Sequence, residues 1–212
     1  MKIALIGASG FIGSALRDEA LRRGHAVTAL VGHPERLQPA PRLTARRADV
    51  MDADALAQAL RGHDAVLSAF SGHAQPDIYA YYMRGFHSIL DAVKAAGVPR
   101  LLVVGGAASL ETAPGKLLFD SPDFPEAYRP TAQGALDALR ALRREDTLDW
   151  TMLSPAAEIF PGERSGAFRL GRDTLLADGE GRSRISTGDY AAAMIDELET
   201  PAHPRQRFCV AY

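Results

Sequence analysis

The chain has 212 residues, of which 47% are hydrophobic and 24% charged, and this balance indicates a folded protein with a sizeable core. Its formal net charge of −2 excludes the basic field that recruits nucleic acid or an anionic membrane surface. Cys209 is the only cysteine, which excludes an intrachain disulfide and a cysteine-based zinc site. The six histidines have no helical metal-ligand spacing, so we expect no metal site and place them on the surface or in loops.

Short apolar runs alternate with helical patterns along most of the chain. Strands are predicted at Ile3–Ile6, Ala26–Val31, Arg42–Ala48, Ala65–Ala69, Leu101–Val104 and Trp150–Leu153. Helices are predicted at Phe11–Arg23, Ala53–Leu60, Ile78–Ala96 and Thr131–Arg144. Because continuous apolar strands alternate with helices, we predict an α/β fold, a doubly wound parallel sheet of the Rossmann type with helices on both faces.

The last part of the chain departs from this alternation. Phe168–Leu176 predicts an antiparallel excursion, followed by a helix at Gly188–Leu198 and a final strand at Arg207–Ala211. Since no linker or repeat divides the chain, we expect one domain over residues 1–212 with a small C-terminal extension. Two stretches rich in Pro and Gly, 105–130 and 155–187, are long for loops in a compact domain and are predicted to wall a substrate pocket.

The apolar start of the chain predicts a buried strand and not a signal peptide. Glycines interrupt it at regular spacing, and it runs into Arg17-Asp18-Glu19, where a cleavage region needs small uncharged residues. No segment approaches the length of a membrane span. We therefore expect a cytoplasmic protein without a membrane partner.

A glycine-rich turn joins the first predicted strand to the first predicted helix. Gly7 permits a tight turn, Gly10 lets backbone N–H groups approach a pyrophosphate, and Gly13 permits close packing of helix on sheet. The helix N-terminus adds partial positive charge. This context predicts an NAD(P)-binding turn made of Gly7, Ala8, Ser9, Gly10, Phe11, Ile12 and Gly13.

The end of the second strand normally distinguishes NAD from NADP. An acidic residue there binds the ribose 2′-hydroxyl, whereas an arginine binds the 2′-phosphate. No carboxylate follows Val31 directly, and His33 and Arg36 lie close by, so the segment favours NADPH over NADH; both side chains are equally consistent with exposed loop positions. Asp49, with Val50, is placed to meet the adenine, or to cap the helix that begins at Ala53.

Several further motifs accompany this turn. They are Ala48-Asp49-Val50, Asp64-Ala65-Val66-Leu67-Ser68-Ala69-Phe70, Arg100-Leu101-Leu102-Val103-Val104-Gly105-Gly106-Ala107-Ala108-Ser109-Leu110, Leu148-Asp149-Trp150-Thr151-Met152-Leu153-Ser154-Pro155 and Ile185-Ser186-Thr187-Gly188-Asp189-Tyr190-Ala191. With these motifs, nearly the whole chain resembles the atypical short-chain dehydrogenase/reductase superfamily. It is most similar to the NAD(P)H-binding proteins named for NADH-flavin reductases, which are related to NmrA-like proteins and biliverdin reductase B.

The resemblance implies that three loops surround the nicotinamide. They would contribute Ala69, Phe70 and Ser71, then Gly105, Gly106 and Ser109, then Pro155, Ala156 and Ala157. Two departures from the family pattern stand out. Relatives often carry an arginine at the position of Gly32, and conventional short-chain dehydrogenases have a tyrosine with a lysine four residues later. Here Tyr128 is followed at that spacing by Ala132, and the only lysines are Lys2, Lys94 and Lys116.

Without that pair, an acceptor that needs no strong general acid fits best. A flavin or quinone takes a hydride into its π-system, so we predict an NAD(P)H-dependent reductase with a planar acceptor, and a flavin as substrate rather than tightly bound cofactor. Ser109 and Tyr128 are the candidates for contact with the acceptor. Two alternatives stay open: a non-enzymatic redox sensor of the NmrA type, and a relative of the sugar-nucleotide epimerases or dehydratases.

Overall fold

The computed structural model describes residues 1–73 and 75–212. An eight-stranded sheet has the order β10-β12-β8-β5-β4-β1-β2-β3. Its strands are β1 (Lys2–Ile6), β2 (Ala26–Val31), β3 (Leu43–Arg47), β4 (Ala65–Ser68), β5 (Arg100–Val104), β8 (Asp149–Ser154), β10 (Arg169–Gly171) and β12 (Gln206–Ala211). All neighbouring strands are parallel except β10 and β12, which confirms the doubly wound, Rossmann-type sheet.

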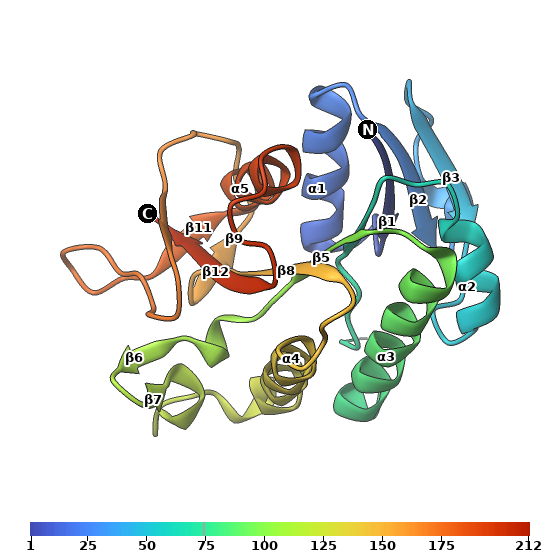
Figure 1. The fold of residues 1–212 in the computed structure, drawn as a ribbon. Coiled ribbons are helices and arrows are strands. Elements are labelled where there is room, and N and C mark those ends of the chain that lie inside the picture. The colour runs from blue at the N-terminus through green and yellow to red at the C-terminus, as the bar shows by residue number, and fades with distance from the viewer. Residues whose placement is uncertain (74) are drawn as a thin grey trace.

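Within the described residues, five α-helices cover the two faces of this sheet (Figure 1). They are α1 (Phe11–Arg22), α2 (Ala53–Leu60), α3 (Ile78–Ala96), α4 (Arg129–Leu142) and α5 (Thr187–Glu199). Helices α1 and α5 lie side by side on one face, whereas α3 packs between α2 and α4 on the other. Each face has its own core of fully buried side chains, for example Leu16 and Tyr190 on the α1 side and Phe86 and Trp150 on the α3 side.

Local signals explain why the predicted bounds of α2 and α3 are correct. Asp52 and Asp77 precede these helices and accept hydrogen bonds from the backbone N–H groups of Ala55 and Ala80, each at 3.0 Å. Gly97 ends α3 in the left-handed conformation, with φ at 68°. The alternative role considered for Asp49, capping α2, is wrong, because Asp52 occupies that position.

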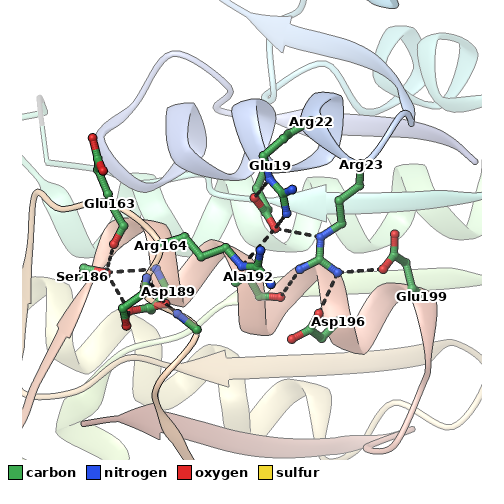
Figure 2. Close-up of polar contacts among 12 residues, drawn as sticks. Glu19, Arg22, Arg23, Glu163, Arg164, Ser186, Asp189, Ala192, Asp196 and Glu199 are labelled. Atoms are coloured by element: carbon green, nitrogen blue, oxygen red, sulfur yellow. Dashed lines mark hydrogen bonds and ion pairs between the residues drawn. The ribbon is translucent and has the colours of Figure 1, made fainter.

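Hydrogen bonds and ion pairs connect α1 to α5 (Figure 2). Glu19 is buried, and hydrogen bonds from Arg22 outweigh the effect of burial, so that with further bonds from Arg23 the pKa of Glu19 falls from 4.5 to about 2. The Arg23 guanidinium also reaches Asp196 at 2.6 Å and Glu199 at 2.7 Å. The two helices are therefore joined through charged groups as well as apolar packing.

Three histidines outside the helices and strands have polar partners inside the protein. His25 is buried, with its Nε2 atom 2.8 Å from Glu199 Oε1, and His63 and His203 are half-buried with polar partners of their own. The expectation that the six histidines lie on the surface or in loops is nonetheless confirmed, since His25 belongs to the loop between α1 and β2. Among the described residues no helix combines the length and apolarity needed to cross a membrane.

The two Pro- and Gly-rich stretches contain short elements that periodicity did not predict. The first holds the antiparallel pair β6 (Glu111–Ala113) and β7 (Lys116–Leu117) and three 3₁₀ turns. The second holds β9 (Glu158–Phe160), which pairs in parallel with β11 (Arg184–Ser186). The predicted antiparallel excursion is present as β10, which covers only three residues of Phe168–Leu176.

Candidate functional site

A cleft of about 910 Å³ crosses the carboxyl edge of the sheet. It runs over the ends of β1, β4, β5 and β8, and so includes the point between β1 and β4 where the strand order reverses. Doubly wound sheets bind their ligands at this point. The lining side chains are mostly apolar and come from the start of α1, the loops after β4, β5 and β8, and the first turns of α3 and α4.

The glycine turn at one end of the cleft has little room for side chains. Gly7 has φ at +79°, and a Cβ on Gly13 would lie only 2.0 Å from the Gly7 carbonyl oxygen. Gly10 differs, because its φ of −77° and ψ of 176° suit any residue and a Cβ there would meet one atom, at 3.3 Å. Gly7 and Gly13 therefore shape the turn, whereas Gly10 keeps the approach to it open.

The N-terminus of α1 suits an anion. Gly10 is the N-cap residue and supplies no side-chain cap, and the first turn contains no acidic residue. The N–H groups of that turn and the positive end of the helix dipole are therefore directed at the cleft, which Gly10, Phe11, Ile12 and Gly13 line. Ala8 is buried and Ser9 exposed, and neither lines the cleft.

The residues predicted to contact the adenosine lie outside the cleft, beyond the glycine turn. Arg36 ends a short 3₁₀ turn after β2 and is exposed, and His33 lies beside Glu35 with Nδ1 and Oε1 3.0 Å apart. Asp49 is exposed and accepts a hydrogen bond from the Met51 N–H at 2.9 Å. The structure brings these side chains to the carboxyl ends of β2 and β3, outside the cleft that holds the glycine turn.

The loops after β4, β5 and β8, which the resemblance predicts around the nicotinamide, all line the cleft. Ala69, Ser71, Gly106, Pro155 and Ala156 all line it. Gly105 also lines it and is locked in place, because its N–H donates to the Leu153 carbonyl at 2.8 Å. A ligand ring there would meet backbone and small side chains on the sheet side.

The Phe70 ring packs partly into the protein. It stacks on Tyr82 with centroids 6.0 Å apart, and a Cβ on Gly85 of α3 would lie 2.3 Å from it. Val50, also predicted to meet the cofactor, is close to the same glycine. Phe70 thus lines the cleft and also anchors its loop on α3.

Ser109 does not fit its predicted role. It is 4% exposed, does not line the cleft, and donates to the Gly106 carbonyl at 3.2 Å. The buried Arg207 of β12 donates to the Ser109 hydroxyl at 3.1 Å. The prediction that Ser109 contacts an acceptor is therefore corrected, since its hydroxyl serves as a partner for a buried guanidinium.

Tyr128 does lie at the cleft, with 62% of its surface exposed, immediately before α4. Ala132, one turn along, is buried and also lines it. Sequence reasoning missed Tyr82, whose ring faces the cleft from α3 and whose pKa burial raises. The position of Tyr82 early in a helix that starts at the carboxyl edge of the sheet was the available signal.

Outside the cleft, a buried carboxylate of α5 binds the stretch that follows β9 (Figure 2). Asp189 of α5 accepts hydrogen bonds from Ser165 Oγ at 2.6 Å, Gly166 N at 2.7 Å and Tyr212 Oη at 2.7 Å. Burial alone would raise the pKa of Asp189, but these donors outweigh it and lower the pKa. The stretch around residues 162–166 is thereby fixed to the same helix that packs on α1.

A doubly wound sheet with an open helix N-terminus and a glycine turn at its switch point defines a dinucleotide-binding protein of the Rossmann class. The model of the NAD(P)H-binding family matches residues 7–201. The chain belongs to this family.

Known proteins similar to the chain cover its whole length. The "uncharacterized protein YwnB" of Bacillus subtilis is 39% identical over 99% of this chain and 98% of its own. A "putative epimerase" of Bacteroides thetaiotaomicron is 47% identical with a TM-score of 0.93, covering 100% of this chain and 96% of that one. A "putative NADH-flavin reductase" of Streptococcus pneumoniae is 35% identical with a TM-score of 0.89, covering 100% and 99%.

Proposed function

We propose that the chain is an NAD(P)H-dependent reductase that passes a hydride to a planar acceptor such as a flavin or a quinone. The observation that carries the proposal is the continuity of the cleft, which extends from the glycine turn past β4 and β5 to the end of β8. Its volume of about 910 Å³ lies near the top of the range of roughly 300–1,000 Å³ for ligand pockets. Such a cleft has room for a second ring beside a nicotinamide.

The chain's own residues would bind and orient both partners. The N–H groups before and within the first turn of α1 would hold the pyrophosphate, and the loops after β4, β5 and β8 would position the nicotinamide. A bound reduced nicotinamide supplies the hydride. Phe124, Tyr128 and Ile159 would cover the acceptor from the outside and keep water away from the reacting rings.

The small side chain of Ala132 argues against the alcohol–ketone chemistry of conventional relatives. In those enzymes a lysine ammonium lowers the pKa of the catalytic tyrosine. Here the corresponding helical position holds a buried methyl group, and none of the chain's tyrosines has a lysine four residues later. The same observation disfavours an epimerase, although one similar protein carries that name.

Replacing Tyr128 by phenylalanine should reduce turnover of a flavin or quinone by less than about fivefold, because the ring, not the hydroxyl, is expected to contact the acceptor. Tyr128→Ala removes the ring and serves as the comparison, with a larger rise in KM expected. Steady-state NADPH oxidation with menadione and with riboflavin gives both values. A loss of several orders of magnitude in Tyr128→Phe, with NADPH affinity unchanged, would restore tyrosine catalysis. Tight NAD(P)H binding without turnover of any flavin or quinone would instead favour the redox sensor.

Arg36 provides a test of cofactor preference, for which we propose NADPH. Arg36→Ala should weaken NADPH binding by about tenfold and NADH binding much less, because only NADPH offers a 2′-phosphate to the guanidinium. Titration calorimetry with both cofactors measures this difference. Arg61→Ala is the control, since Arg61 is equally exposed but follows α2, at the opposite edge of the sheet. Equal losses for the two cofactors would show that Arg36 does not read the 2′-phosphate.

A further inference from the structure

The side of the cleft formed by the stretches after β5 and β8 carries negative charge. Asp123, from the stretch after β5, and Glu158, at the start of β9, are the carboxylates that line the cleft. Both lie on the β5 and β8 side, whereas the phosphate-binding turn lies on the β1 side. An acceptor held beside the nicotinamide would therefore lie near these two groups, with apolar neighbours such as Leu118, Phe124 and Ile159.

The two carboxylates differ in how far neighbouring cations neutralise them. Arg184 donates two hydrogen bonds to Glu158, at 2.8 and 3.1 Å, and so offsets most of its charge. Asp123 is exposed, and within residues 1–73 and 75–212 its carboxylate has no ion-pair partner. The guanidinium of Arg129 stacks on the neighbouring Phe124 ring with 5.7 Å to its centroid, but it pairs with Glu126. Asp123 is thus the main source of uncompensated charge on this side.

We infer that the acceptor is a neutral planar molecule, and that Asp123 discriminates against acceptors that carry a phosphate or other anionic group. The inference rests on the proposed reductase function and names the class of its second substrate. Its physical basis is simple, because an anion near Asp123 meets like charge while an uncharged ring gains from the apolar lining. Neutral quinones and flavins without phosphate satisfy both conditions.

Two matched acceptor pairs test the inference. Riboflavin and FMN share a ring system and differ in a phosphate, and menadione and its sulfonate differ in one anionic group. With NADPH present, kcat/KM for each neutral member should exceed that of its anionic partner by about five- to tenfold at low salt, and less at high salt as screening increases. Quenching of flavin fluorescence by the protein, measured without NADPH, should show the same order in the dissociation constants.

Three single substitutions test which carboxylate makes the protein prefer neutral over anionic acceptors. Asp123→Asn should bring the ratio of neutral to anionic acceptor close to one, mainly through better binding of the anion, while Glu158→Gln changes it less. Asp120→Asn is the control, because Asp120 is exposed in the same stretch but does not line the cleft. Equal or better use of the anionic members by the unmodified protein, or an unchanged ratio in Asp123→Asn, would overturn the inference while leaving the reductase in place. No binding or turnover of either member would overturn the proposed function and the inference with it.

Discussion

Replacing Gly10 by valine should weaken binding of both NADPH and NADH by at least about a hundredfold while leaving a folded protein. The backbone of Gly10 is ordinary for any residue, and a Cβ there meets only the Gly7 carbonyl oxygen at 3.3 Å. The valine side chain would instead occupy the space in front of the first turn of α1, where the pyrophosphate is expected. A hundredfold loss corresponds to about 2.7 kcal/mol of binding free energy.

Titration calorimetry gives the two dissociation constants, and far-UV circular dichroism with a melting curve reports the fold. The comparison is Gly13→Ala, in which the new methyl group would lie 2.0 Å from the Gly7 carbonyl oxygen. Because that oxygen belongs to the backbone of the turn, this smaller substitution should lower the melting temperature much more than Gly10→Val does. Unchanged cofactor affinity in Gly10→Val would remove the glycine turn from the binding site.

Replacing Glu197 by alanine should cost roughly 3–5 kcal/mol of unfolding free energy, the effect expected when one partner of a buried ion pair is removed. Glu197 is 4% exposed and accepts hydrogen bonds from Arg100 at 2.8 Å and from the His203 N–H at 2.9 Å. Arg100 is itself buried, and its Nε atom has no hydrogen-bond partner among the described residues. Without Glu197, the guanidinium keeps only its contacts with Asp149.

At roughly 2–4 °C per kcal/mol for a chain of this size, the melting temperature should fall by about 6–20 °C. Asp196→Ala is the control on the same helix, since its half-exposed carboxylate should contribute less than about 1 kcal/mol. The double variant Arg100→Met with Glu197→Met should recover part of the loss, because it leaves no unpaired buried charge. If the double variant is as unstable as Glu197→Ala, the cost comes from packing and not from the unpaired guanidinium.

The elements that the sequence predicted accurately are those with strong local signals. Helix α3 has an aspartate cap at one end and a left-handed glycine at the other, and both of its bounds were correct. The glycine turn also follows from local requirements, because the Gly7 carbonyl oxygen lies where a Cβ on Gly13 would be, only six residues along the chain. The doubly wound, mostly parallel arrangement of the sheet follows from strand–helix alternation and right-handed connections.

What the sequence could not predict depends on contacts between distant segments. The hydroxyl of Ser109 was expected in the cleft, but Arg207, 98 residues later, binds it inside the protein. The pairs β6–β7 and β9–β11 are two or three residues long, too short for a periodic pattern. Tyr82 was missed for a related reason, since its contacts with the Phe70 loop and with Gly134 of α4 form only in the folded chain.

The pairing of α1 with α5 has a consequence for synthesis on the ribosome. Arg23 and its partner Asp196 are 173 residues apart, so α1 emerges long before the helix that covers its face of the sheet. Until α5 has been made, the apolar surface around Leu16 and Ala20 lacks its final cover, although β1 and β2 are already available to pair. Contacts between residues this distant in sequence slow folding and prolong the exposure of apolar surface. The nascent chain therefore covers this surface only after α5 (Thr187–Glu199) has been synthesised, and until then the exposed apolar side chains favour aggregation.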